Sequence, residues 1–212
     1  MRRPSELSEV HSQKKTEVLA EQIAEETIVA IGGADIKSVS SNTEDGIFAV
    51  VYQIRIGDLH LDIVSRSDRL PVQIRHIYSV PDSLMIDWSE EQLNDLPDET
   101  TDSFPIDVNE YPRRAANLQV LAEMDESDKR EVNYYLAEKL QSPHTLWGWE
   151  MHDGVAYKTE VRRTVFPSQN FHTMEHTRAA VTAVFGVSVR VKNFLRYTFQ
   201  DIPDETLGSV ES

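Results

Sequence analysis

The sequence predicts an α+β fold in which one antiparallel β-sheet is flanked by helices. Two pairs of strand-like segments are each joined by a two-residue turn, Gly57–Asp58 and Asp153–Gly154, and such turns are typical of antiparallel hairpins. Apolar residues recur at helical spacing before, between and after these hairpins. The expected order is helix, three strands, helix, two strands and a long helix, with an acidic insertion at about residues 67–110. We expect a single domain over residues 1–212, because this length is within the range of one domain.

The first helix is expected over residues 9–31. Its apolar and small residues recur every three or four positions and therefore share one helix face: Leu19, Ala20, Ile23, Ala24, Thr27, Ile28 and Ile31. The pair Gly32–Gly33 is expected to end this helix, because glycine readily adopts the left-handed conformation found at helix C-termini. A short strand over 36–41 and a turn over 42–46 follow.

The first hairpin has the clearest pattern in the chain. A two-residue loop at Gly57–Asp58 sets a register that pairs Ile56 with Leu59, Ile54 with Leu61, and Tyr52 with Ile63. All six of these side chains then lie on one face, and the opposite face carries polar residues: Gln53, Arg55, His60 and Asp62. This alternation predicts a strand pair that is buried on one side.

The middle of the chain is expected to be acidic and mostly helical. Patterns favour a strand over 72–79 and helices over 89–96, 111–122 and about 125–141, the last with Asp125 or Ser127 as its N-cap. Residues 97–110 are expected to form an acidic linker, because they combine prolines with carboxylates and lack an apolar period. Residues 201–212, with four acids and no base, are expected to form a frayed acidic tail.

The second hairpin, over 146–151 and 155–165, carries an unusual aromatic face. The strand period places Trp147, Trp149 and Met151 on one side, and Tyr157 on the other. Both faces are partly apolar, so the pair is either covered on both sides or offers a binding surface. Because large aromatic side chains dominate protein interfaces, we predict Trp147, Trp149, Met151 and Tyr157 as partner-binding residues.

The last helix is expected over 171–197, with a split at Gly186 as the alternative. Its first turn reads His172-Thr-Met-Glu175-His176, the H-x-x-E-H spelling found in inverzincin peptidases. On a helix these three side chains share a face, so His172, Glu175 and His176 are an alternative prediction of a Zn²⁺ site. The further carboxylate ligand that such peptidases need has no clear candidate downstream, so we predict no cofactor and no catalytic residue as the leading interpretation.

Composition excludes several classes of protein. There are no cysteines, which excludes disulfides and thiolate metal sites. The formal net charge of −15 makes a nucleic-acid partner improbable, because phosphates repel an acidic surface. No apolar run is long enough to span a membrane and no signal peptide precedes the first helix, so we expect a cytoplasmic protein. An acidic, cysteine-free chain also suits high salt, which predicts a halophilic origin and unfolding at low salt.

The element order resembles a known family. The turn Asp153-Gly154-Val155, the alternating strand after it and the long terminal helix are similar to the second half of a small α/β sandwich. Type III secretion chaperones and the bacterial YbjN-type regulator domain share this sandwich. The resemblance covers most of the chain, and the insertion at 67–110 departs from it. It implies an antiparallel sheet backed by helices, frequent dimerisation, peptide or protein partners, and no catalytic residues.

The leading functional prediction is a non-enzymatic protein-binding module of regulator or chaperone type, with another protein or a second copy of the chain as its partner. One alternative is a small zinc-dependent hydrolase that uses His172, Glu175 and His176. A second alternative is a structural component of a larger assembly, such as a virus particle, since it would carry the same aromatic patches.

Overall fold

A computed structural model describes residues 4–94, 96, 110–167 and 172–198. The chain forms two compact units. Unit 1 consists of Met1–His76, Ser142–Leu146 and Val161–Gly186, and unit 2 of Ile77–Gln141, Trp147–Glu160 and Val187–Ser212.

The strands form one six-stranded sheet, and the α+β class predicted from the sequence is confirmed. The order across the sheet is β1-β2-β3-β4-β6-β5, so that β1 and β5 are its two edges. The strand bounds are β1 Asp35–Glu44, β2 Ile47–Ile56, β3 Leu59–Arg66, β4 Arg69–Ser79, β5 Leu146–His152 and β6 Val155–Val165. The described helices are α1 Pro4–Ile31, α2 Val80–Ser83, α3 Glu90–Asn94, α5 Pro112–Glu123, α6 Glu126–Leu140 and α7 Met174–Thr198.

The first predicted hairpin is confirmed residue by residue. Strands β2 and β3 pair antiparallel with Ile56 opposite Leu59, Ile54 opposite Leu61 and Tyr52 opposite Ile63. The inward residues Ile54, Leu61 and Ile63 are completely buried. The loop between β1 and β2 is shorter than the predicted turn over 42–46, because Asp45 and Gly46 alone, both with positive φ, reverse the chain. A two-residue turn of this kind matches the twist of the flanking strands, so β1 extends to Glu44.

The region around 67–110 begins with a strand of the sheet, β4, where the sequence predicts a strand over 72–79. Strand β4 lies between β3 and β6. Its inward residues Val72, Ile74, His76 and Tyr78 alternate with more exposed ones and are buried, which is the pattern of a strand covered on one face. The predicted linker over 97–110 has only Glu110 among the described residues, and the predicted tail over 201–212 lies outside them.

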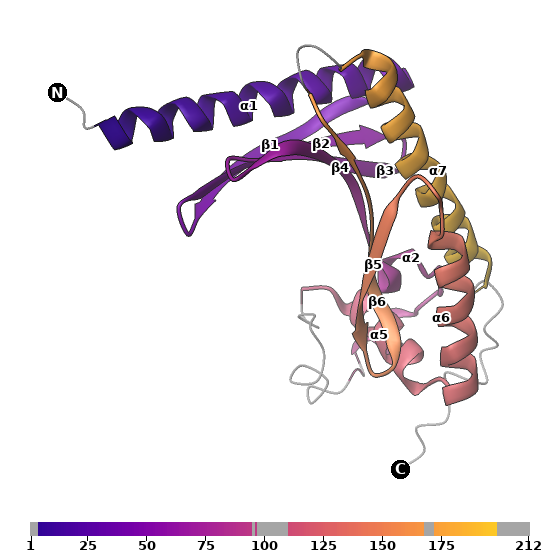
Figure 1. The fold of residues 1–212 in the computed structure, drawn as a ribbon. Coiled ribbons are helices and arrows are strands. Elements are labelled where there is room, and N and C mark those ends of the chain that lie inside the picture. The colour runs from indigo at the N-terminus through magenta and orange to yellow at the C-terminus, as the bar shows by residue number, and fades with distance from the viewer. Residues whose placement is uncertain (1–3, 95, 97–109, 168–171, 199–212) are drawn as a thin grey trace. The chain divides into compact units, whose positions relative to one another are not determined.

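In unit 1, helix α1 lies along one face of β2 and β3 (Figure 1). Its buried stripe is Thr16, Ala20, Ile23, Ala24 and Thr27, whereas Leu19, Ile28 and Ile31 are only half-buried. The prediction is therefore correct for Ala20, Ile23, Ala24 and Thr27, and the remaining predicted residues lie at the border of the buried face. Small residues at the contact allow Ala20 to pack closely against Phe48 and Val50 of β2.

In unit 2, helices α5, α6 and the second half of α7 supply a core of leucines and valines, among them Leu118, Leu136 and Leu195, which are completely buried. A buried polar bridge holds α2 and α5 together. The Nδ2 group of Asn117 donates to the carbonyl oxygen of Pro81 at 2.7 Å, and the indole N–H of Trp88 donates to Oδ1 of Asn117 at 2.7 Å. Both polar ends of the amide are thereby satisfied, as a buried amide requires.

Helix α7 differs from the prediction at its start and agrees with it in its middle. It runs through Gly186 without a split. It begins at Met174, not at residue 171, so Thr173 directly precedes its first turn. The backbone N–H of Thr173 donates to Nδ1 of His176 at 3.1 Å, so the His176 side chain reaches back to the cap as a glutamate does in a capping box. His172 therefore lies outside the helix.

Candidate functional site

The β5–β6 hairpin is built by a tight turn that α6 holds in place. Asp153 and Gly154 both have positive φ, of 46° and 79°, as a two-residue hairpin turn demands. From α6, Nδ2 of Asn133 donates to the carbonyl oxygen of Gly154 at 2.7 Å, and Oδ1 of Asn133 accepts from the backbone N–H of Ala156 at 3.2 Å. One amide side chain thus holds the second turn residue and the start of β6.

The residues predicted to bind a partner lie on this hairpin, and three of them form one surface. Trp147 is 36 % exposed, Met151 is 45 % exposed, and Trp149 between them is half-buried. The rings of Trp147 and Trp149 meet edge to face with centroids 5.2 Å apart. We call Trp147, Trp149 and Met151 the aromatic edge, because β5 is an outer strand of the sheet.

Tyr157, the fourth predicted residue, lies on the opposite face of the hairpin. Its hydroxyl donates to Oε2 of Glu150 at 2.6 Å, and Nζ of Lys158 is 2.8 Å from Oε1 of the same carboxylate. The hydrogen bonds from Lys158 and Tyr157 lower the pKa of Glu150, and the bond to Glu150 raises the pKa of Tyr157. Tyr157 therefore holds the one acid of β5 and does not extend the aromatic edge.

The backbone of β5 also offers hydrogen-bonding groups at its outer side. In a hairpin with a two-residue turn, the pair that flanks the turn is hydrogen-bonded, and the bonded pairs then alternate along the strands. His152, Glu150 and Gly148 consequently bond to β6, while Trp147, Trp149 and Met151 direct their N–H and C=O groups outward. The bond from the N–H of Ala156 to Asn133 agrees with this register, because Ala156 lies opposite Met151 and turns its N–H away from β5.

The two edges of the sheet differ in how they are protected against pairing. Edge strands are commonly protected by lysine, proline, irregular register or charge. Strand β1 has Lys37 at a break in its register between Ile36 and Ser38. Strand β5 has no lysine, no proline and one carboxylate, Glu150. Among the described strands, β5 is therefore the edge best suited to pairing with an additional strand.

The three residues of the H-x-x-E-H spelling have different partners. Nε2 of His172 is 2.7 Å from Oε2 of Glu26 in α1. Glu175 forms an ion pair with Arg178 at 3.3 Å, and His176 caps α7. The imidazole rings have centroids 6.1 Å apart, and among the described residues no group of three or more His, Asp or Glu side chains is arranged to hold a metal.

The structure instead places His172 in a buried cluster with Glu26 and Thr177, here named the Glu26 cluster. Thr177 is completely buried, its hydroxyl donates to Oε2 of Glu26, and the Glu26 side chain is 18 % exposed. Burial raises the pKa of Glu26. Hydrogen bonds from Thr177, Gln22 and His172 outweigh burial, and the charge of His172 adds to them, so the pKa lies below its ordinary value. Sequence reasoning missed Glu26, because its partners are 146 and 151 positions away.

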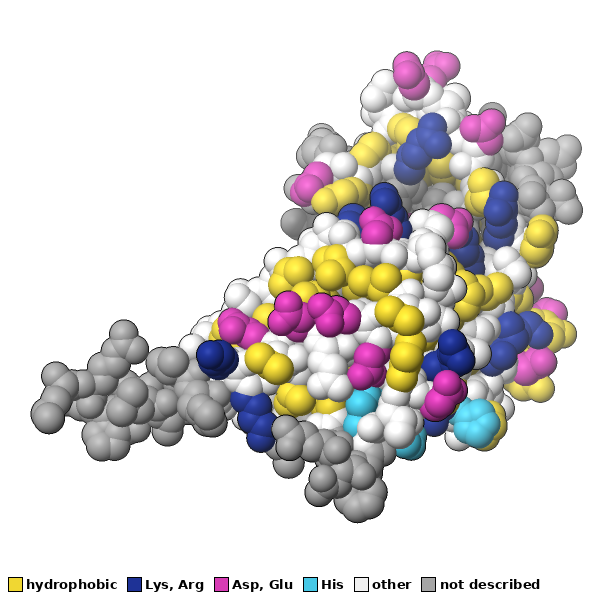
Figure 2. Space-filling model, turned by 90° about the horizontal axis from the view of Figure 1, so that it is seen from above, with side chains coloured by type: hydrophobic (Ala, Val, Ile, Leu, Met, Phe, Trp, Pro, Cys, Tyr) yellow, Lys and Arg dark blue, Asp and Glu magenta, His cyan; other side chains and the backbone are white. Residues whose placement is uncertain are grey.

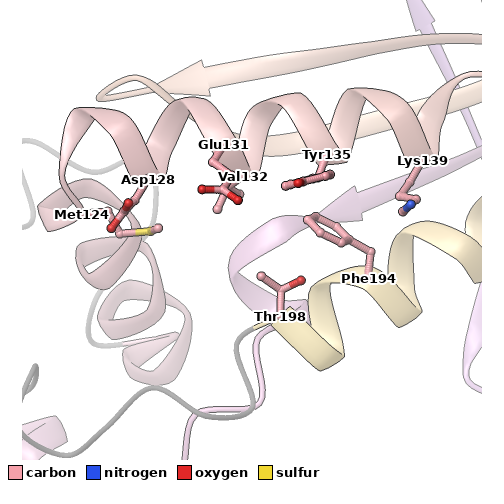
Figure 3. Close-up of a pocket in the computed structure, with 8 residues that line it drawn as sticks. All are labelled: Met124, Asp128, Glu131, Val132, Tyr135, Lys139, Phe194 and Thr198. Atoms are coloured by element: carbon pink, nitrogen blue, oxygen red, sulfur yellow. The ribbon is translucent and has the colours of Figure 1, made fainter.

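A groove between α6 and the end of α7 in unit 2 is the second candidate surface. It has a volume of about 380 Å³. Its lining residues are Met124, Asp128, Glu131, Val132, Tyr135, Lys139, Phe194 and Thr198 (Figure 3). Tyr135 and Phe194 meet across it with ring centroids 6.3 Å apart. Figure 3 shows Asp128 and Glu131 toward one end of the groove and Lys139 toward the other.

Acidic side chains also mark the outer surface of α1. Burial raises the pKa of Tyr52 in β2, and the nearby carboxylates of Glu21, Glu17 and Glu25 raise it further. These three glutamates recur every four residues and are exposed. Figure 2 shows one face of the molecule, on which acidic side chains stand beside hydrophobic ones.

Among the described helices, none combines the length and apolar character needed to span a bilayer.

Comparison with known proteins adds one finding about the fold. No protein-family model matches the chain, and no curated protein matches it. Its structure is similar to the crystal structure of an uncharacterized protein from Methanothermobacter thermautotrophicus, with 10 % sequence identity and a TM-score of 0.52. The match covers 85 % of this chain and 99 % of that chain. At this identity the likeness shows the fold alone, and the predicted resemblance to YbjN-type domains and type III secretion chaperones stays a prediction.

Proposed function

We propose that this protein is a non-enzymatic binding module that captures another polypeptide as an additional strand beside β5. The observation that carries the proposal is the aromatic edge: Trp147 and Met151 are exposed on an outer strand of the sheet. The geometry of a two-residue hairpin turns the backbone groups of these residues away from β6. Main-chain hydrogen bonds to an added strand supply affinity, and contacts with alternate side chains supply specificity. Trp147 and Trp149 would provide that specificity, because aromatic anchors account for most of the binding energy at interfaces.

The zinc-hydrolase alternative has less support. Its three candidate ligands are separately engaged by Glu26, by Arg178 and by the cap of α7, so assembling them would require each contact to break. The buried hydrogen bond between His172 and Glu26 has a structural role already, since it connects the residues just before α7 to α1 within unit 1.

Selection from a random peptide library tests the proposal and requires no named partner. The immobilised protein should enrich peptides that alternate apolar and polar residues, because such peptides pair with an edge strand. A double variant, Trp147→Ser with Trp149→Ser, should lose this enrichment. The matched control is Phe194→Ser, which removes an aromatic side chain from the groove beside α6 and should keep it.

Two outcomes would contradict the proposal. Enrichment that survives in the double tryptophan variant would place binding elsewhere than β5. Enrichment that is lost in Phe194→Ser and kept in the tryptophan variant would assign binding to the groove. Circular dichroism of each variant establishes that the fold is retained before binding is compared.

A further inference from the structure

We propose that the strand captured by β5 is β5 of a second copy of this chain, paired antiparallel about a two-fold axis at Trp149. This inference rests on the proposed function and names its partner. In that arrangement Trp149 lies opposite Trp149 of the second copy, and Trp147 lies opposite Met151. An isologous contact of this kind closes as a dimer and leaves no further edge at β5.

The backbone register favours this centre over its neighbours. Trp147, Trp149 and Met151 are the residues of β5 with outward N–H and C=O groups, and a ladder centred on Trp149 uses all three in both copies. It would contain about six inter-strand hydrogen bonds, two for each facing pair. A ladder centred on Glu150 would place Glu150 opposite Glu150 of the second copy and Trp147 opposite Asp153 of the turn. A ladder centred on Met151 would place Trp149 opposite Asp153, which belongs to the turn.

The side chains of β5 are also compatible with this register. The net charge of −15 makes two copies repel each other over most of their surface, so a contact between copies must avoid facing carboxylates. Strand β5 meets this condition, because its one acid, Glu150, lies opposite Gly148 when the axis is at Trp149. Glu150 is further balanced by Lys158 of its own chain at 2.8 Å. On the other face, the aromatic edges of the two copies would join into one continuous apolar stripe.

Position 148 provides a matched pair of variants for the test. A Cβ at Gly148 would meet no atom within 4 Å, and its φ lies outside the left-handed range, so longer side chains fit there. Gly148→Lys should strengthen the dimer, because each new ammonium faces Glu150 of the other copy. Gly148→Glu should weaken it by placing two carboxylates face to face. With two such pairs in each dimer, each change should shift the dimer dissociation constant by about twofold to about thirtyfold, in opposite directions.

Sedimentation equilibrium over a range of protein concentrations measures both shifts against the wild-type chain. Thermal melting of the two variants at the lowest concentration separates any effect on the fold. Equal effects of Gly148→Lys and Gly148→Glu on association would overturn the proposed register. A wild-type chain that stays monomeric throughout would overturn the self-pairing.

Because the chain contains no cysteine, single cysteines report the register directly. In the proposed dimer the two copies of residue 149 have Cα atoms about 5.5 Å apart, within disulfide reach. Trp149→Cys should therefore form a disulfide-linked dimer on oxidation. Met151→Cys is the control on the same face: its two copies would be about 13 Å apart along the strands and should not link. Equal linking of both variants, or linking of Met151→Cys alone, would refute the register.

These experiments separate the inference from the function on which it rests. If the chain stays monomeric but still selects extended peptides through Trp147 and Trp149, the self-pairing is wrong and the binding function stands with another partner. If peptide selection also fails, both proposals are wrong.

Discussion

The Glu26 cluster gives a stability prediction in which a charged and a neutral hydrogen bond can be compared at two equally buried threonines. Thr177 and Thr27 are both completely buried. The hydroxyl of Thr177 donates to the carboxylate of Glu26, whereas the hydroxyl of Thr27 donates to the carbonyl oxygen of Ile23 in its own helix at 2.7 Å. Substitution by valine removes either hydroxyl while keeping the shape of the side chain.

The two substitutions should differ in cost. Thr177→Val removes a hydrogen bond to a charged, largely buried acceptor, which should lower the free energy of unfolding by about 1.5–3 kcal/mol at neutral pH. Thr27→Val removes a hydrogen bond to a carbonyl that already accepts one within the helix, so its cost should be about 1 kcal/mol or less. Urea unfolding followed by circular dichroism measures both, provided that the slope against denaturant stays constant.

Only the first cost should depend on pH. The pKa of Glu26 is lowered in the folded chain, so its contribution to stability is present above the ordinary pKa of 4.5 and is lost as the pH falls through the folded value. The difference between wild type and Thr177→Val should therefore be full at about pH 7 and shrink below about pH 4.5. Equal costs for the two variants, or a pH-independent cost for Thr177→Val, would refute this reasoning.

Three further predictions concern the hairpin, the metal and the salt dependence. Asn133→Ala leaves the N–H of Ala156 and the carbonyl of Gly154 without their partner, so it should cost about 1–3 kcal/mol in urea unfolding; an unchanged midpoint would contradict that role. Calorimetric titration of the wild-type chain with Zn²⁺ should detect no binding site that depends on His176. A stoichiometric site that is present in the wild type and lost in His176→Ala would restore the metal interpretation. The melting temperature should rise with salt concentration because screening reduces self-repulsion at a net charge of −15, and a fall would oppose the halophilic prediction.

The hairpins could be predicted from the sequence because the information that sets them is local. A two-residue turn and a strict alternation set the pairing of Ile54 with Leu61, because each of these residues lies three positions from the turn Gly57–Asp58. The exposure of the aromatic edge could not be predicted in the same way. A strand with the local pattern of Trp147 and Trp149 can lie either in the centre of a sheet or at its edge. The position of β5 at the edge depends on the pairing of β4 with β6, which local sequence does not report.

The Glu26 cluster and the start of α7 were beyond local reasoning for different physical reasons. Glu26 meets Thr177 across 151 positions, and no periodicity within either helix reports that contact. At the start of α7, the sequence of two histidines and a glutamate suggested metal ligands. The side chain of His176 instead satisfies a backbone N–H at the helix end, a use that the spelling does not distinguish.

The turns of unit 1 and the contact between Glu26 and Thr177 have a consequence for the time course of folding. Strands β1 to β4 follow one another through short turns, while the contact between α1 and α7 closes most of the chain into a loop. Contacts between near neighbours in the chain form quickly and long loops close slowly, so the meander should form first and α7 should dock last. Interactions that form after the rate-limiting step set the rate of unfolding more than the rate of refolding. This one hydroxyl and carboxylate, far apart in the chain, would therefore govern the lifetime of the native state more than the speed with which it is reached.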